Sequence, residues 1–281
     1  MDIREIPVQK ISDAIASMCI KINHELSDDM RQLLDEAAQK ETSALGCKVL
    51  HTLQENLVVA KEEQIPICQD TGMAVVFMEI GQDVHFVGGS IEDAVNEGVR
   101  RGYEEGYLRK SVVADPIERV NTKDNTPAVI HYKLVPGDTV HITLSPKGFG
   151  SENMSQVFMK KPADGMDGIR DAILTVVTMA GPNACPPMIV GVGVGGTFEK
   201  AAVLAKEALA GIASPYNRAW VTELEQEMLD AINQTGIGPG GLGGKMTALA
   251  VRINTYPTHI AGLPVAVNIC CHVNRHISQV I

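Results

Sequence analysis

The sequence predicts an α/β protein of mixed helices and sheets, with a helical N-terminus and two lobes around a shared site. Apolar residues recur at helical spacing through roughly the first sixty residues. Short apolar runs typical of strands then alternate with amphipathic helices to the end of the chain. We expect one domain over residues 1–281, with an N-terminal helical part over about 1–64 and an α/β body over about 65–281.

Two apolar stripes predict the N-terminal helices, and the second helix is expected to start near Thr42 or Ser43. The stripes comprise Val8, Ile11, Ile15, Met18 and Ile22, and then Val49, Leu50, Leu53 and Leu57. Cys19 and Cys47 fall inside these helices. Because free cysteines are usually buried, we expect both to belong to the core.

The α/β body is predicted from runs that switch between strand and helix patterns. Ser90 is a predicted N-cap for a helix that continues to about Glu105. Residues 128–135 and 139–145 alternate around Pro136-Gly137, which predicts a β-hairpin. Further strands are expected over 73–80, 84–87, 188–194, 248–254 and 264–270, and further helices over about 167–179, 197–210 and 219–234.

Composition and charge exclude several functions. The net charge of −10 disfavours a nucleic-acid or anionic-membrane surface, since both need basic residues. The uncharged run over 172–198 contains three prolines and five glycines, which argues against a lipid-facing helix. The N-terminus lacks the apolar stretch of a secretory signal. We therefore expect a soluble cytoplasmic protein whose six cysteines are reduced thiols.

Two glycine motifs suggest nucleotide binding but fail on context. Residues 191–196 match GxGxxG, yet no second strand ending in Asp or Glu follows about 20 residues later. Close packing of a helix on a strand accounts better for these glycines. The loop 236–245 ends in Gly-Gly-Lys, but Pro239 and Met246 stand where a phosphate loop needs Gly and Ser or Thr.

Three cysteines lie where predicted elements end. Cys68 is in a polar turn, Cys185 is in a proline-rich loop, and Cys271 follows the last apolar strand. Three thiols are too few for a closed structural zinc site, and no CxxC pair is present. They suit an iron–sulfur cluster with one open iron that acts as a Lewis acid. A single reactive thiol and scattered structural cysteines are the alternatives.

Several segments together resemble the class I, iron–sulfur-dependent fumarate hydratases. They are PICQDTG, LRKS, NTKDNTPA, KGFGSEN, GPNACPPMIVGVGVGG and VNICCHVNRH. The resemblance is to the α subunit of the two-subunit form, covers essentially the whole chain, and extends to L-tartrate dehydratase α subunits. It implies a single iron–sulfur hydro-lyase domain of the α type.

The resemblance implies that Cys68, Cys185 and one of the late cysteines hold a [4Fe–4S] cluster. Placing the family's Cys-x-x-x-Arg pattern on Arg275 selects Cys271 over Cys270. Adjacent strand residues face opposite ways, so only one of these two thiols can point at the cluster.

The resemblance also assigns substrate and proton-transfer residues. Gln69 is expected to bind a substrate carboxylate, and Asp70 to take part in proton transfer, since a cationic neighbour favours an ionised carboxylate. Arg109 is expected to grip a carboxylate bidentately. Gly150 is expected to approach the substrate through its backbone, and His259 to lie near the active site. Apart from the family, each has an ordinary interpretation, such as a turn-capping Asp or a loop histidine.

The implied reaction is the reversible hydration of fumarate to (S)-malate, a step of the tricarboxylic acid cycle. Single-chain relatives carry a second domain that supplies further substrate-binding residues. We therefore expect a separate β subunit, an αβ hetero-oligomer and little activity from the α chain alone. L-tartrate dehydratase, mesaconate hydratase and a non-catalytic cluster-binding subunit are the alternatives, and a dinucleotide-binding oxidoreductase ranks behind them.

Overall fold

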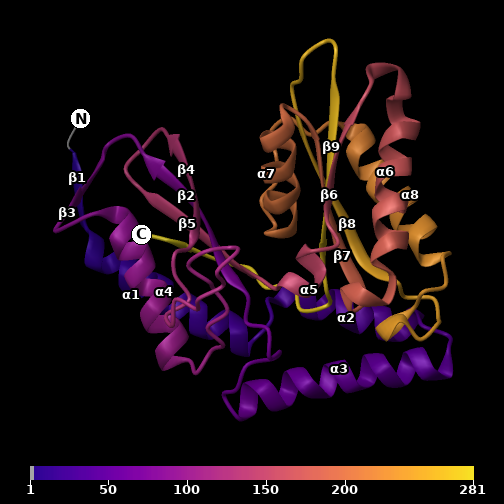
Figure 1. The fold of residues 1–281 in the computed structure, drawn as a ribbon, viewed down its shortest axis with the longest axis horizontal. Helices are drawn as coiled ribbons and strands as arrows, with labels where there is room; N and C mark the ends of the chain where they lie inside the picture. The colour runs from indigo at the N-terminus through magenta and orange to yellow at the C-terminus, as the bar shows by residue number, and fades with distance from the viewer. Residues whose placement is uncertain (1–2) are drawn as a thin grey trace. The chain divides into compact units, whose positions relative to one another are not determined.

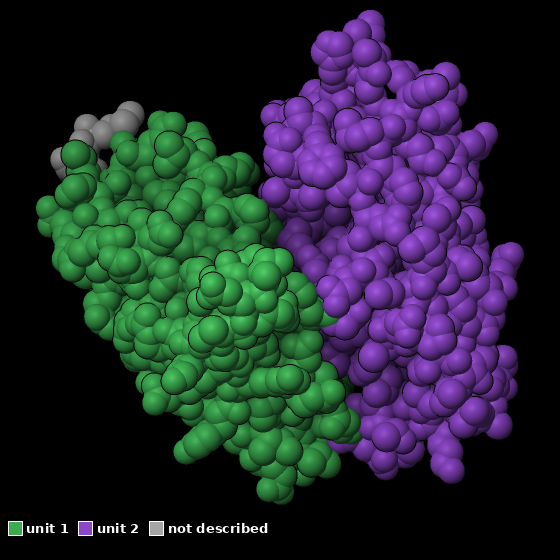
Figure 2. All heavy atoms as spheres, in the orientation of Figure 1, with its two compact units in different colours: residues 1–27, 56–149, 275–281 green, residues 28–55, 150–274 purple. Residues whose placement is uncertain are grey.

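The structure is a computed structural model that describes residues 3–281. The chain forms two compact units, each assembled from segments that are distant in the sequence (Figure 1, Figure 2). Unit 1 comprises residues 1–27, 56–149 and 275–281, and unit 2 comprises residues 28–55 and 150–274. The first boundary between them falls at Ser27 and the second within helix α3 (Ala44–Glu62), so the N-terminal helices are divided between the units.

Unit 1 contains a four-stranded sheet in the order β10-β5-β2-β4. Its strands are β2 (Met73–Gly81), β4 (Val129–Val135), β5 (Val140–Lys147) and β10 (Ile277–Val280). Helices α1 (Val8–His24) and α4 (Ile91–Glu105) pack against each other and on this sheet. A separate parallel pair joins β1 (Arg4–Pro7) to β3 (Val84–Val87).

Alternate residues of the two central strands form the core of unit 1. Val76 and Met78 of β2 lie in one buried cluster with Ile142 of β5. Ile15 from α1 and Tyr103 from α4 complete this cluster from the helical side. The period of two in the strands therefore matches the single apolar face that the helices cover.

The predicted hairpin between β4 and β5 is wrong. Both strands pair with β2, which lies between them: β4 runs parallel to β2, and β5 runs antiparallel to it. The connecting turn crosses the end of β2, where the N–H of Gly81 donates to the carbonyl of Thr139 at 2.9 Å. A Cβ on Gly81 would lie 2.3 Å from the Gly137 oxygen, so only glycine allows this crossing. The apolar β2 is thereby buried in the middle of the sheet.

Unit 2 contains a second four-stranded sheet in the order β6-β9-β7-β8, with helices on both faces (Figure 1). Its strands are β6 (Gln156–Lys160), β7 (Met188–Gly195), β8 (Ala248–Tyr256) and β9 (Leu263–Cys270). Its helices are α2 (Asp28–Lys40), the first part of α3, α6 (Gly165–Ala180), α7 (Phe198–Leu209) and α8 (Ala219–Asn233). Short helical turns are α5 (Phe149–Glu152, at the unit boundary), η1 (Pro162–Asp164), η2 (Gly181–Ala184) and η3 (Pro239–Gly241).

The glycines of the GxGxxG match allow helix α7 to pack closely on strand β7. A Cβ on Gly193 would lie 2.0 Å from the Ala201 carbonyl oxygen of α7, and a Cβ on Gly191 would lie 2.4 Å from that of Ala205. Helix α7 can therefore contact this face of the sheet at backbone distance, as the sequence interpretation expected. The opposite face presents valines to α6 and α8, in the largest apolar cluster of unit 2.

Most of the other element predictions are confirmed. Ser90 caps α4 by accepting the N–H of Asp93 at 3.3 Å. Helix α3 begins at Ala44, and the Ser43 hydroxyl accepts the N–H of Gly46 at 3.3 Å. The short strands β1, β6 and β10 were not predicted, because four or five residues carry little periodic signal. No helix among the described residues is long and apolar enough to cross a membrane.

The glycine-rich loop that resembles a phosphate loop instead holds a carboxylate of the chain itself. Both carboxylate oxygens of Glu41 accept the N–H of Lys245, at 3.0 and 2.9 Å, and one accepts that of Met246 at 2.8 Å. The N–H groups of Thr42 and Ser43 donate to the same carboxylate at 2.8 Å. Burial raises the pKa of Glu41, but the backbone donors outweigh it and lower that pKa below its usual 4.5. Glu41 therefore ties this loop to the start of α3.

Replacing Glu41 by Gln is expected to lower the free energy of unfolding by about 2 kcal/mol at pH 7, because the amide turns donors toward backbone N–H groups. A lowered pKa in the folded state stabilises the protein above pH 4.5, and this contribution is lost as the pH falls through the folded value. The difference between wild type and Glu41→Gln should therefore shrink on acidification. Urea denaturation at a series of pH values measures it.

The matched control is Glu36→Gln on α2, where an exposed carboxylate pairs with Lys40. This exposed pair lies outside the glycine-rich loop, so the urea midpoint should stay unchanged. Two results would argue against a stabilising role of the Glu41 carboxylate in the glycine-rich loop. One is an equal effect of the two substitutions, and the other is a Glu41→Gln effect that persists unchanged at low pH.

Candidate active site

In unit 1 the turn from Cys68 to Gly72 leads into β2, and it holds the Asp70 carboxylate in one orientation. Asp70 Oδ1 accepts the N–H of Gly72 at 3.0 Å, and Oδ2 accepts the N–H of Phe149 at 2.9 Å. Asp70 is half-buried. An ionised carboxylate offers about four lone-pair directions, so each oxygen can still accept a proton or a hydrogen bond. The two backbone bonds therefore orient Asp70 without using up its acceptor capacity.

Arg275, from the C-terminal segment, supports the backbone of this turn. Its guanidinium is buried, and it donates to the Asp70 carbonyl at 2.9 Å and to Asn23 Oδ1 at 2.6 Å. The Asn23 carbonyl in turn accepts the N–H of Ile67 at 2.9 Å. These contacts hold the chain on both sides of Cys68. A guanidinium suits this task, because its planar fork can serve two acceptors at once.

The backbone of Arg109 lies beside the same turn. The Thr71 hydroxyl donates to the Arg109 carbonyl at 3.0 Å. The Tyr103 hydroxyl donates to the Thr71 carbonyl at 2.7 Å and to that of Gly72 at 3.0 Å. Burial raises the pKa of Tyr103, so its hydroxyl keeps the proton that it donates. Unit 1 therefore brings together the predicted Asp70 and Arg109, together with Gln69, which is exposed in the turn.

In unit 2 the strand pairing brings Cys185 and Cys271 to one end of the sheet. Strands β7 and β9 are antiparallel, and Ile189 lies opposite Cys270. Cys185 shortly precedes β7, and Cys271 directly follows β9. The Nδ1 atom of His272 lies 3.1 Å from the Cys185 carbonyl oxygen. Two of the three predicted cluster cysteines are thus neighbours in this unit.

The cysteines differ in burial. Cys19 is buried, as predicted, and burial raises the pKa of its thiol to about 12. Cys47 is exposed on α3, so its predicted core position is wrong; its thiol instead donates to the Glu41 carbonyl at 3.5 Å. Cys270 is buried and Cys271 is half-buried, as expected for adjacent strand residues on opposite faces.

Neither unit alone, over residues 3–281, contains three or more His, Cys, Asp or Glu side chains grouped to hold a metal ion. Cys68 belongs to unit 1, whereas Cys185 and Cys271 belong to unit 2. Cys68 and Cys271 are half-buried, and Cys185 is exposed. The three predicted ligands are therefore all at least partly exposed, and none of them is a buried thiol.

Gly150 and His259 have different surroundings. Gly150 is exposed in α5, and no described atom within 4 Å would meet a Cβ there, so its backbone is open to a ligand. His259 lies in the turn between β8 and β9, where its Nδ1 accepts the N–H of Ala261 at 3.1 Å. The eight residues of β9 separate this turn from Cys271 by about 25 Å. Unit 2 therefore does not bring His259 to the two cysteines.

Several residues that contact or lie near the Cys68–Gly72 turn were not predicted from the sequence. Tyr103 and Asn23 lie on helices far from the motifs, and no local pattern indicates their contacts with the turn. Lys147 is buried at the end of β5, and its amino group donates to the Gly148 carbonyl at 3.2 Å. No local pattern marks Lys147 as buried, because lysine side chains are usually exposed.

A family model described as "Fumarate hydratase (Fumerase)" matches residues 12–280. The chain belongs to the fumarate hydratase family. It is therefore a hydro-lyase, and the resemblance stated above is confirmed. Within this family, it is 39% identical over 273 residues to the "Putative L(+)-tartrate dehydratase subunit alpha" of Methanocaldococcus jannaschii, with 95% of each chain covered.

Two further relatives of this fumarate hydratase family member are from Escherichia coli. The L(+)-tartrate dehydratase subunits alpha of strains UTI89 and K12 are each 29% identical over 273 residues. These matches cover 95% of this chain and 89% of each relative. The similarity therefore extends over nearly the whole length of proteins that are named as one subunit of an enzyme.

Proposed function

We propose that this chain is the α subunit of an iron–sulfur hydro-lyase that catalyses the reversible hydration of fumarate to (S)-malate. The observation that carries this proposal is the turn of unit 1, where Asp70 is oriented by two backbone bonds and the backbone of Arg109 is hydrogen-bonded next to it. This arrangement occurs in a chain that matches the fumarate hydratase family over residues 12–280.

The donor set fits a [4Fe–4S] cluster. Thiolates are the usual ligands of such clusters, and Cys68, Cys185 and Cys271 are the three thiols that lie outside helices and strands. We propose that these three hold the cluster. When bound, it would supply an open iron that acts as a Lewis acid toward the substrate hydroxyl.

The chain's own residues would bind the substrate and move a proton. The Arg109 guanidinium and the Gln69 amide would hold carboxylate groups of a dicarboxylate. The oriented Asp70 carboxylate would take a proton from the carbon beside the one that bears the hydroxyl, and would return it in the reverse direction. The Gly150 backbone would approach the substrate from its open side. His259 lies at the other end of β9 from Cys271, so this proposal gives it no step at the cysteine end of unit 2.

A β subunit is part of this proposal. The relatives are named as α subunits, and the match covers nearly all of each of them, so a partner chain would complete the substrate site. We propose an αβ hetero-oligomer in the cytoplasm, where thiols stay reduced.

L-tartrate dehydration is the second candidate, and the names of the relatives favour it. The same residues would serve that reaction, because tartrate is also a dicarboxylate that loses a hydroxyl as water. We place fumarate first on the resemblance of the KGFGSEN and NTKDNTPA segments to the fumarase branch of the family.

The αβ complex, purified anaerobically with the partner chain that co-purifies from the source organism, is expected to turn over fumarate with the highest kcat/KM. The panel is fumarate, (S)-malate, L-tartrate and mesaconate, and the α chain alone should show little or no turnover. A preference for L-tartrate would replace fumarate by the second candidate. Full activity of the α chain alone would remove the need for a β subunit, and an inactive complex with an intact cluster would favour a non-catalytic subunit.

A further inference from the structure

The NTKDNTPA segment has no role in the site described so far, yet it contains a fully buried polar residue. Asn125 is inaccessible to solvent and has a left-handed backbone with φ of 62°. Its side-chain oxygen accepts the N–H of Ser111 at 2.7 Å, and its side-chain nitrogen donates to the Gly72 carbonyl at 3.1 Å. One buried amide therefore joins the segment after Arg109 to the turn that carries Asp70.

A second bond joins the same two segments. The Thr71 hydroxyl donates to the Arg109 carbonyl at 3.0 Å, one residue from Asp70. We propose that Thr71 and Asn125 are positioning residues that hold Arg109 in register with the turn and so set the affinity for the substrate carboxylate. This inference rests on the proposed function, because it assumes that Arg109 binds that carboxylate.

The Arg109 guanidinium is positioned through the backbone of this residue, because its side chain has no partner of its own among the described residues. It is exposed, and it makes no hydrogen bond or ion pair with any other residue in the described part of the chain. No side-chain contact within the described chain therefore fixes the guanidinium before substrate binds. The position of its Cα is the remaining constraint, and the two bonds set that position. A shift of about 1 Å in a binding group is enough to weaken an interaction severely.

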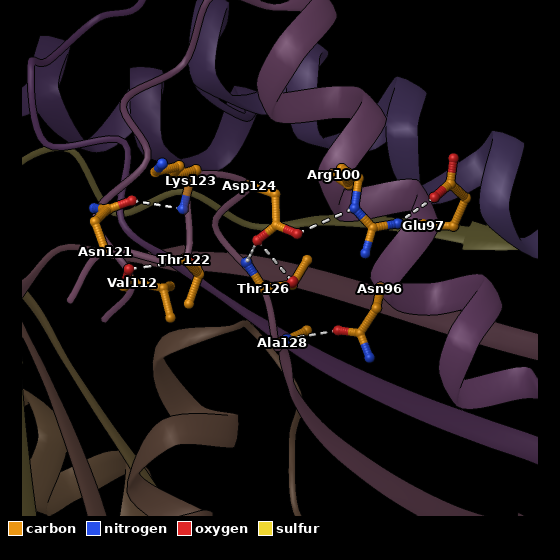
Figure 3. Close-up of polar contacts among 10 residues, drawn as sticks. All are labelled: Asn96, Glu97, Arg100, Val112, Asn121, Thr122, Lys123, Asp124, Thr126 and Ala128. Atoms are coloured by element: carbon orange, nitrogen blue, oxygen red, sulfur yellow. Dashed lines mark hydrogen bonds and ion pairs between the residues drawn. The ribbon is translucent and has the colours of Figure 1, made fainter. Parts of the chain in front are cut away.

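The loop around Asn125 is itself anchored to α4, as Figure 3 shows. Asp124 accepts the backbone N–H and the hydroxyl of Thr126 at 3.0 and 2.8 Å, and its other oxygen accepts Arg100 Nε at 3.1 Å. Arg100 also pairs with Glu97. Burial raises the pKa of Asp124, but these bonds outweigh it and lower that pKa to about 2. Asp124 therefore stays charged at neutral pH and keeps the loop in place.

Two further contacts fix the two ends of this loop. At one end, the Asn96 side-chain oxygen accepts the N–H of Ala128 at 2.9 Å (Figure 3). At the other end, the Thr122 hydroxyl donates to the Val112 carbonyl at 3.3 Å. A loop anchored at both ends can hold Asn125 in an unfavourable backbone conformation, as is common next to functional sites.

The test is Thr71→Val in the αβ complex, because valine keeps the shape of threonine but cannot donate to the Arg109 carbonyl. KM for the dicarboxylate is expected to rise roughly tenfold, the cost of about one hydrogen bond, while kcat changes less than about threefold. Thr71→Ser, which keeps the hydroxyl, should restore KM. Thr52→Val is the matched control: it removes a hydroxyl that donates to the Lys48 carbonyl at 3.1 Å on α3, outside the turn and the Asn125 loop, and KM should stay unchanged.

A double-mutant cycle separates positioning from general stability. In an Arg109→Ala background, Thr71→Val should raise KM no further, because the group that Thr71 positions is absent. Asn125→Asp, which keeps the acceptor for Ser111 but loses the donor to Gly72, should behave in the same way. Thermal unfolding and iron content, measured on every variant, show that the fold and the cluster are retained.

Two outcomes would overturn the inference, and they differ. If Arg109→Ala leaves KM unchanged, Arg109 does not bind substrate, and this part of the proposed function fails together with the inference. If Arg109→Ala raises KM but Thr71→Val and Asn125→Asp add their full effects to it, only the positioning role is wrong.

Discussion

Replacing Cys68, Cys185 or Cys271 by Ala is expected to abolish hydro-lyase activity and cluster binding together. Each of these thiols follows the end of a helix or strand and is at least partly exposed. Three thiolates would leave one iron open for substrate, so the loss of any one removes a ligand that no nearby thiol replaces. The wild-type protein, reconstituted anaerobically, should contain about four irons per chain and absorb broadly near 400 nm.

Cys270→Ala and Cys47→Ala are the controls for this experiment. Cys270 is 3% exposed and faces the core, and Cys47 is exposed on α3, so neither is expected to bind iron. Iron and sulfide analysis of all five variants measures the outcome. A cluster that survives Cys271→Ala but not Cys270→Ala would show that the third ligand is the other late cysteine. A wild-type chain that binds no cluster would refute the proposed cofactor.

Replacing Asp70 by Asn is expected to lower kcat by roughly 10²–10⁴-fold, the usual contribution of a general acid–base group. The amide keeps the shape of the carboxylate but cannot take up a proton at neutral pH. It also turns a donor toward the N–H of either Gly72 or Phe149, so some of the orientation is lost as well. Steady-state kinetics of the αβ complex, with iron content as a check on the cluster, measure this effect.

A matched control distinguishes proton transfer from the loss of a turn. Asp115 also accepts two backbone N–H groups, from Ile117 and Glu118, and these bonds lower its pKa. Asp115→Ala therefore removes both of these turn contacts outside the proposed site, and its kcat should stay within about twofold of the wild-type value. Similar losses of kcat in the two variants would indicate that Asp70 acts only through the turn.

Much of the fold was predictable because it depends on neighbours along the chain. Helical spacing located α1 and α3, and Ser90 marked the start of α4. Alternation and apolar runs located the long strands, and the element ends placed Cys68, Cys185 and Cys271 outside the core. These features follow from periods of 3.6 and 2 residues and from capping, which need no knowledge of distant contacts.

The sequence predictions were wrong where the position of a segment depends on contacts with a remote part of the chain. The alternating runs on either side of Pro136 have the pattern of a hairpin, but β2 inserts between them because its mostly apolar sequence is more stable with strands on both sides. The prediction that Cys47 is buried was wrong for a related reason. The packing partners of α3 determine which of its residues are buried, and the apolar pattern of α3 is too weak to indicate this by itself.

The sequence by itself determined the family and the α/β class, and it predicted the chemistry-bearing residues of the candidate site. Only the tertiary structure showed that Arg275 and Asn23 hold the Cys68–Asp70 turn, that Asn125 links Gly72 to Ser111, and that His259 lies at the far end of β9 from Cys271. The physical reason is that residue type and spacing limit which reactions a chain can support. The orientation of each side chain depends instead on hydrogen bonds between segments as much as 252 residues apart, which no local pattern encodes.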